Sequence, residues 1–89
     1  MNYQDQVVVL TGASGGIGSA MAKKFTDLGA KVALLDITVD RVQALADKLG
    51  LGSDRAFCAA VDVSNEESVK ATVDAIVKHF GRIDVLVNA

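Results

Sequence analysis

The apolar residues of this 89-residue sequence fall into two patterns that alternate along the chain. One pattern is a short, mostly continuous apolar run of four to six residues. Runs of this length predict β-strands that are covered on both faces of a sheet. The sequence therefore predicts four strands, at residues 7–10, 32–35, 56–61 and 83–87.

The second pattern lies between these runs and has the period of an α-helix. Each of three stretches carries a single apolar stripe, so we expect three amphipathic helices that pack against the sheet. The stripes are formed by Ile17, Met21, Phe25 and Leu28, by Val42, Leu45, Ala46 and Leu49, and by Val69, Val73, Ile76, Val77 and Phe80.

Start and stop signals agree with this order of elements. The segment SNEE predicts Ser64 as the N-cap of the third helix, with Glu67 completing a capping box. Gly29, Gly50 and Gly81 each follow a helical stretch, where a left-handed residue is expected. The predicted order is β-α-β-α-β-α-β, with connections short enough for right-handed crossovers between parallel strands.

Composition and charge narrow the class of protein. The sequence is 51% hydrophobic and 22% charged, which is typical of a globular domain, and its net charge of −2 offers no basic field for nucleic acid or anionic lipid. It contains neither a secretory signal nor the run of about 20 apolar residues that a membrane helix needs. A single cysteine, Cys58, excludes an internal disulfide and a cysteine-based metal cluster. We expect a soluble cytoplasmic protein without a metal site.

A glycine-rich turn, TGASGGIG at residues 11–18, joins the first strand to the first helix. The free N–H groups and the dipole at a helix N-terminus favour an anion such as a phosphate. Gly12 can form the tight turn, Gly16 lets the backbone approach a pyrophosphate, and Gly18 lets the helix pack close to the strand. An ordinary strand-to-helix turn is the alternative. A P-loop is excluded, because no Gly-Lys-Ser/Thr sequence closes the motif.

The turn resembles the cofactor signature of the short-chain dehydrogenase/reductase family. Other segments match the family in the same order and cover nearly all of the chain. They are LLD, which ends at Asp36 twenty residues after Gly16, VDVS, which contains Asp62 and Val63, and DVLVNA, in which Asn88 matches the first Asn of the family's Asn-Asn-Ala-Gly motif.

The resemblance implies an α/β fold, a Rossmann-like doubly wound parallel sheet with strand order 3-2-1-4. Residues 1–89 would then be the N-terminal dinucleotide-binding part of a Rossmann-fold domain, truncated at the fourth strand. Either Ala89 stands where the family usually has its second Asn, or the match to the motif is shifted by one residue.

The resemblance also implies roles for individual residues. The backbone N–H groups of Ser14 and Ile17 would contact the ribose and pyrophosphate, and the Asp36 carboxylate would accept from the ribose hydroxyls. Asp62 would accept from the adenine amino group, and Val63 would offer its N–H. Simpler alternatives are turn formation for the loop and for Asp62, and an N-cap of the second helix for Asp36.

The cofactor is expected to be NAD. A carboxylate at Asp36 would repel the 2′-phosphate of NADP. NADP-favouring members often carry a basic residue just before the second motif glycine or just after the acid. Those positions hold Gly15 and Ile37, and neither is basic. Asn88 would lie in the region that braces the sheet beside the cofactor.

The family's catalytic groups are not found in this sequence. A Tyr with a Lys four residues later acts as acid and base in the family, whereas the one tyrosine here, Tyr3, is followed four residues later by Val7. We expect the parent protein to be a homo-oligomeric, NAD-dependent oxidoreductase acting on an alcohol or carbonyl, with 3-oxoacyl-thioester reduction as the leading reaction. These 89 residues alone would be inactive. The alternative is a non-catalytic module that binds or senses NAD.

Overall fold

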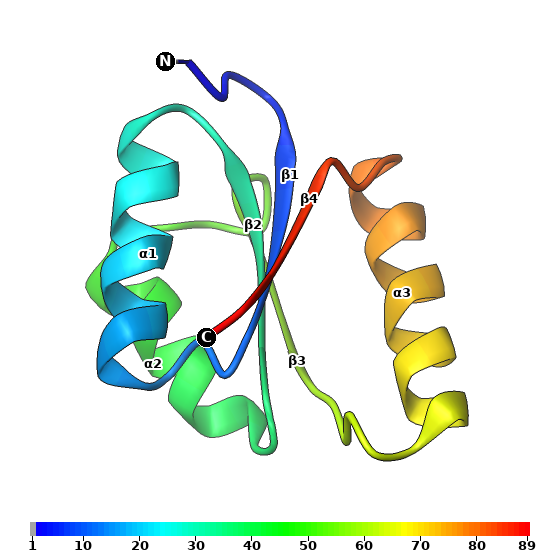
Figure 1. Cartoon of the computed structure of the whole chain (residues 1–89). Coiled ribbons are helices and arrows are strands. Elements are labelled where there is room, and N and C mark those ends of the chain that lie inside the picture. The colour runs from blue at the N-terminus through cyan, green and yellow to red at the C-terminus, as the bar shows by residue number, and fades with distance from the viewer. Residues whose placement is uncertain (1) are drawn as a thin grey trace.

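A parallel four-stranded sheet forms the centre of the molecule, with helices on both of its faces (Figure 1). The computed structural model describes residues 2–89. Its strand order, β3-β2-β1-β4, confirms the predicted order and the doubly wound α/β architecture. Along the chain the elements are β1 (Val7–Thr11), α1 (Gly16–Asp27), β2 (Lys31–Asp36), α2 (Val39–Lys48), β3 (Ala56–Ala60), α3 (Glu66–Phe80) and β4 (Val85–Asn88).

The two inner strands are buried because helices cover both of their faces. Successive side chains of a strand point to opposite faces. In β1, Val8 and Leu10 therefore pack in the apolar cluster that includes Ala22 of α1 and Val42 of α2. The intervening Val7 and Val9 pack with Ile76 of α3 in a second cluster.

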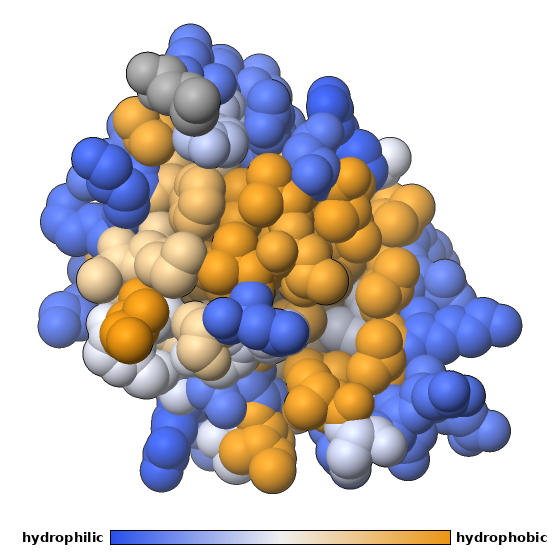
Figure 2. All heavy atoms as spheres, viewed as in Figure 1, coloured by the Kyte–Doolittle hydropathy of each residue, from blue (hydrophilic) through white to orange (hydrophobic). Residues whose placement is uncertain are grey.

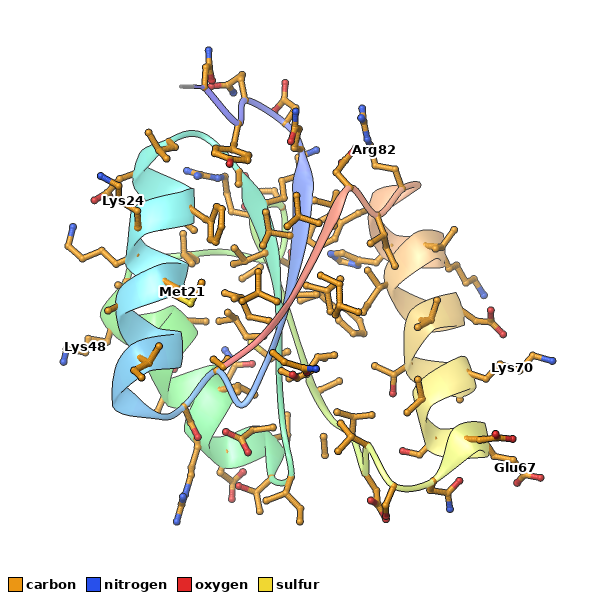
Figure 3. All side chains as sticks on the ribbon, in the orientation of Figure 1. Met21, Lys24, Lys48, Glu67, Lys70 and Arg82 are labelled. Atoms are coloured by element: carbon orange, nitrogen blue, oxygen red, sulfur yellow. The ribbon has the colours of Figure 1, made fainter. Side chains whose placement is uncertain are left out.

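Polar residues of the helices face the solvent. Figure 3 shows Met21 directed from α1 toward the sheet, while Lys24 of the same helix points outward. Lys70 of α3 also points away from the sheet. The predicted apolar stripe of α2 marks its buried side, as the fully buried Val42 shows. The stripes of α1 and α3 are only partly buried, since Ile17 is 74% exposed and Val73 and Val77 are 40% and 42% exposed. Hydrophobic burial of the remaining stripe residues places the helices on the sheet.

The outer strands differ from the prediction of strands covered on both faces. β4 begins at Val85, two residues later than predicted, and its side chains are alternately half-buried and exposed. Leu86 is 67% exposed. The residue before β4, Asp84, accepts the Val7 N–H at 2.8 Å with its carboxylate, which joins β4 to the start of β1. Within residues 2–89, β4 pairs only with β1.

The helix ends confirm one prediction and correct another. Gly29, Gly50 and Gly81 all have positive φ angles, as predicted for the residues that follow the helices. The predicted N-cap Ser64 is wrong by one residue. Asn65 is the N-cap of α3, and its side chain accepts the Ser68 N–H at 3.0 Å. Ser64 is used instead in the preceding turn, where its hydroxyl donates to the Asp62 carboxylate at 2.6 Å.

Candidate functional site

The glycine-rich turn lies at the carboxyl ends of the strands, at the point where the order of the strands in the sheet reverses. β2 lies on one side of β1 and β4 on the other, so the order of the strands reverses at β1. In open α/β sheets a crevice forms at such a switch point and binds ligands. Figure 1 shows the C-terminal end of the chain beside the turn between β1 and α1. The Ala89 N–H donates there to the Thr11 carbonyl at 3.0 Å.

Two glycines of the turn are needed because the backbone packs closely around them. Gly12 has a φ of +68°, and a Cβ on it would lie 2.6 Å from the Ala89 carbonyl oxygen. A Cβ on Gly18 would lie 2.5 Å from the Gly12 carbonyl oxygen and 2.8 Å from the Cα of Ala13. A side chain at either position would force the backbone to move.

Gly16 differs because it borders open space. No heavy atom of the described residues lies within 4 Å of the place that its Cβ would occupy. It is the first residue of α1. The N-cap residue of this helix is Gly15, which makes no side-chain capping bond, and the first turn contains no acidic residue. The first N–H groups of a helix lack partners within the helix. With Ile17, which is 74% exposed, Gly16 therefore forms an accessible helix N-terminus suited to an anion.

Asp36 ends β2 and reaches across to the glycine-rich turn. Its Oδ2 accepts hydrogen bonds from the Ser14 hydroxyl and from the Ser14 N–H, the latter at 3.2 Å. Its Oδ1 accepts the Ile37 N–H at 2.8 Å. The Ser14 hydroxyl, followed by the Ile37 N–H, lowers the pKa of the Asp36 carboxyl below its ordinary value. The carboxylate does not cap the second helix, whose N-cap is Thr38.

Thr11 and Asn88 form a polar pair at the ends of β1 and β4. They are register partners in the sheet, and the Thr11 hydroxyl donates to the Asn88 Oδ1. Asn88 thereby joins β4 to the first residue of the glycine-rich turn. Asn88, on β4, lies on the opposite side of β1 from Asp36 at the end of β2.

Asp62 and Val63 follow β3 in an exposed turn. The Asp62 Oδ1 accepts both the hydroxyl and the N–H of Ser64, at 2.6 and 3.0 Å. These two bonds, the hydroxyl first, lower the pKa of the Asp62 carboxyl. Val63 is 68% exposed and Ile37, at the end of the neighbouring strand, is 75% exposed. Two apolar side chains therefore lie open to solvent beside the Asp62 turn.

A cleft of about 410 Å³ runs across these strand ends. It brings together six of the ten residues predicted to bind a cofactor, while Ser14, Gly16, Ile17 and Gly18 lie on the adjoining turn and helix. Sequence analysis did not assign Thr11, Val61 and Ala89 to the site, although each directly adjoins a residue that it named. The cleft is lined by Thr11, Gly12, Asp36, Ile37, Val61, Asp62, Val63, Asn88 and Ala89.

A second hollow of about 550 Å³ lies at the opposite end of the sheet, among the amino ends of the strands. Its cation, Arg55, donates to the carbonyls of Thr26 and Ala30 at 2.9 and 3.1 Å. Arg55 therefore joins the end of α1 to the start of β2. The described residues that line the hollow belong neither to a glycine-rich turn nor to a helix N-terminus.

Among residues 2–89, no three His, Cys, Asp or Glu side chains gather in a group that could hold a metal ion. No helix among these residues has the length and apolar character to cross a bilayer. Cys58 is half-buried, and its burial, followed by the charge of Asp47, raises the pKa of its thiol, which disfavours the reactive thiolate.

Comparison with known proteins identifies the family. Residues 6–89 match the profile described as short chain dehydrogenase. A D-threitol dehydrogenase of Mycolicibacterium smegmatis is 43% identical over 86 residues, covering 94% of this chain and 32% of the relative. An NAD-dependent glycerol dehydrogenase of Listeria innocua is 39% identical over 88 residues, covering 99% and 34%. The chain thus spans about a third of the length of the curated relatives it matches.

Solved structures agree at the level of the fold. The 3-ketoacyl-(acyl-carrier-protein) reductase of Brucella melitensis, complexed with NADH, superposes with a TM-score of 0.87 at 36% identity, covering 96% of this chain and 34% of that one. An NAD⁺-bound xylitol dehydrogenase superposes with a TM-score of 0.83 at 35% identity, covering 97% and 33%. With its glycine-rich turn at the switch point of a Rossmann-like sheet, the chain belongs to the short-chain dehydrogenase family, whose oxidoreductases bind a nicotinamide cofactor.

Proposed function

We propose that residues 1–89 form the N-terminal cofactor-binding part of an oxidoreductase that uses NAD to interconvert an alcohol and a carbonyl. The observation that carries the proposal is the position of the Asp36 carboxylate. It lies at the end of β2, in the cleft at the switch point, and contacts the same turn that leads into the open N-terminus of α1. A negative group in the cleft and a helix end suited to an anion therefore lie on either side of the same turn.

The residues present fit the parts of a dinucleotide. The backbone at Gly16 and Ile17 would hold the pyrophosphate, because their N–H groups begin α1 and open space adjoins Gly16. Asp36 would accept from the adenosine ribose. Ile37 and Val63 offer exposed apolar surface for the adenine. The proposed binding residues are Gly12, Ser14, Gly16, Ile17, Gly18, Asp36, Ile37, Asp62, Val63 and Asn88.

These residues would bind and orient the cofactor, and they would leave the chemistry to groups elsewhere. When bound, the nicotinamide supplies or accepts the hydride. Gly12 and Gly18 shape the turn so that the end of α1 faces the cleft. The bond between Thr11 and Asn88 ties β4 to the same turn, which limits movement of the cleft wall. Fixed positions of this kind reduce the entropic cost of aligning the reactants.

The substrate class is an alcohol and its carbonyl. Among the similar proteins are enzymes named for threitol, glycerol and xylitol, and one named as a 3-ketoacyl-(acyl-carrier-protein) reductase. All of these names describe oxidoreduction between a hydroxyl and a carbonyl carbon, so this shared chemistry is what we propose for the parent protein. The named relatives are dehydrogenases and reductases, and they do not favour a non-catalytic module that senses NAD.

The carboxylate of Asp36 would make the protein prefer NAD to NADP. At an effective dielectric constant of about 20, one pair of like charges about 5 Å apart repels by roughly 3 kcal/mol. NADP also lacks the 2′-hydroxyl, whose hydrogen bond to a charged group contributes about 1.5–3 kcal/mol. Solvent screening and overlap between these terms leave about 2 kcal/mol, which corresponds to a preference of roughly thirtyfold.

Calorimetric titration of the full-length protein with NAD and with NADP tests the proposal. We expect tighter NAD binding in the wild type and loss of most of that preference in Asp36→Ala. Adding Ile37→Arg to this variant should favour NADP, since it places a cation beside the 2′-phosphate. Asp40→Ala, which removes an exposed acid from the first turn of α2, is the matched control and should keep the preference. Equal or tighter binding of NADP by the wild type would contradict the proposal.

The separated 89-residue chain is expected to be inactive. Its one tyrosine, Tyr3, lies before β1, and the residue four positions later is Val7, which is fully buried. No Tyr-x-x-x-Lys pair is therefore available for acid–base catalysis. An assay of nicotinamide absorbance with purified chain and a panel of polyols and ketones checks this. Turnover that persists after purification and disappears in Gly16→Val would show that the chain has catalytic groups of its own.

A further inference from the structure

The two oxygens of the Asp36 carboxylate are held by different parts of the chain. Oδ1 accepts the N–H of the next residue, Ile37, at 2.8 Å. Oδ2 accepts both polar hydrogens that Ser14 can offer, those of its N–H and its hydroxyl. Ser14 is 22 residues away in the sequence. This contact therefore fixes the side chain from outside its own strand.

The Ser14 hydroxyl adds a third hydrogen bond to the two that backbone N–H groups donate to the Asp36 carboxylate. The Ser14 N–H bond to Oδ2 is 3.2 Å long and contributes less than a short charge-assisted bond. A carboxylate has about four lone-pair sites, and Ser14 and Ile37 together occupy three of them. The site left open is on Oδ1. With the hydroxyl in place, the carboxylate, which lines the cleft, therefore keeps one acceptor site free in a defined direction.

The backbone that precedes Ser14 is itself held in place. The N–H of the preceding residue, Ala13, donates to the Leu35 carbonyl at 3.1 Å, so the turn is tied to β2 one residue before Asp36. Ala13 is fully buried, and both Ser14 and Asp36 are half-buried. The serine side chain thus acts from a rigid part of the backbone rather than from a free loop.

We propose that the Ser14 side chain is a positioning residue that sets the direction of the Asp36 carboxylate and thereby strengthens discrimination between NAD and NADP. The proposal rests on the proposed function, in which Asp36 meets the adenosine ribose. Hydrogen bonding to a ribose hydroxyl needs a defined carboxylate direction, whereas repulsion of a phosphate needs only a nearby charge. Loss of the Ser14 hydroxyl lets the carboxylate rotate, which weakens the bond to NAD and lets the charge move away from the phosphate of NADP.

The test uses Ser14→Ala and Ser14→Thr in the full-length protein, with calorimetric titration of NAD and NADP. In Ser14→Ala we expect the ratio of the two affinities to fall about fivefold, the change expected on loss of one typical hydrogen bond. Ser14→Thr keeps a hydroxyl and should restore the ratio. Ser19→Ala is the matched control: the Ser19 hydroxyl donates to the Gly15 carbonyl at 2.7 Å, on the same turn, but does not contact Asp36.

The pH dependence of NAD binding gives a second readout. The Ser14 hydroxyl holds the pKa of Asp36 below its usual value, so the carboxylate stays charged further into the acid range. In Ser14→Ala this pKa rises, and NAD binding should weaken at a higher pH than in the wild type as the solution is acidified. A purely structural role of Ser14 would lower affinity for both cofactors equally and would leave the midpoint of this acid limb unchanged.

The Asp36→Ala variant distinguishes failure of the proposed function from failure of the positioning role of Ser14. If Asp36→Ala leaves the NAD-to-NADP ratio unchanged, the proposed function is wrong. The positioning role alone is wrong if Asp36→Ala abolishes the preference for NAD while Ser14→Ala changes neither the NAD-to-NADP ratio nor the pH at which NAD binding weakens. In the double variant, Ser14→Ala should have no further effect on the ratio, because the group it positions is gone. A further loss of similar size would contradict the positioning role.

Discussion

The atoms that surround each glycine of the turn determine whether that glycine is needed for folding or is accessible for binding. Around Gly18 the nearest atoms belong to the backbone of Gly12 and Ala13, which cannot swing aside as a flexible side chain would. Around Gly16, open space adjoins the helix N-terminus. Two glycines two positions apart in the sequence therefore have different tasks.

Substitution by alanine should separate these tasks. Gly18→Ala is expected to lower the free energy of unfolding by about 1–3 kcal/mol, because its methyl group must displace backbone. Gly16→Ala should stay within about 0.5 kcal/mol of the wild type, as exposed substitutions usually do. Gly16→Val, with a larger side chain beside the proposed pyrophosphate, should weaken NAD binding. Urea unfolding and calorimetric titration of the full-length protein measure the two effects. A large loss of stability in Gly16→Ala would contradict this assignment.

At the scale of elements, the start of α3 shows how a local signal can be displaced by its neighbour. The turn after β3 uses Ser64 to satisfy the Asp62 carboxylate, and the Asn65 N–H donates to the Asp62 carbonyl at 3.0 Å. Because Ser64 belongs to this turn, the helix begins one residue later. Asn65 then caps α3 through the Ser68 N–H.

Removal of the two candidate caps should give unequal results. Asn65→Ala is expected to lower the free energy of unfolding by about 1 kcal/mol, the usual cost of losing an N-cap side chain. Ser64→Ala removes bonds only within an exposed turn and should cost clearly less. Thermal and urea unfolding of the full-length protein, with both variants compared at one pH, measure this difference. A larger effect of Ser64→Ala would restore the cap predicted from the sequence.

At the scale of the whole molecule, apolar surface gathers around the edge strand. Figure 2 shows a broad hydrophobic area across the middle of one face, bordered by hydrophilic residues. Leu86 of β4 is 67% exposed, and Val73 and Val77 of α3 are 40% and 42% exposed. The outer edge of β4 has no strand partner among residues 2–89. Exposed apolar patches and unpaired strand edges both favour association.

The separated 89-residue chain is therefore expected to self-associate as its concentration rises. Sedimentation velocity across a concentration series should show species larger than a monomer. Leu86→Lys should reduce this association, because a charge on an exposed edge strand disfavours edge-to-edge pairing. Lys70→Ala, at an outward-facing position of α3, serves as the control and should leave association unchanged. A monomer at every concentration, with a sharp two-state unfolding transition, would contradict the expectation.

Local patterns in the sequence determined the elements of this protein and their sequential order. Continuous apolar runs become strands because helices cover the inner strands on both faces. The apolar stripe of α2 becomes its buried side, whereas Val73 and Val77 in the stripe of α3 stay exposed. The place of the candidate site could also be predicted. Parallel strands bring their carboxyl ends to one edge of the sheet, so the glycine-rich turn, Asp36 and Asp62 meet there without any knowledge of side-chain geometry.

Only the tertiary structure decided which polar groups pair with one another. Ser14 meets Asp36 across 22 residues, and Thr11 meets Asn88 and Val7 meets Asp84 across 77 residues each. Such bonds depend on strand register and on side-chain rotamers, which no local periodicity encodes. The exposure of β4 likewise depends on its place at the edge of the sheet, because an apolar run has the same pattern whether or not other elements cover it.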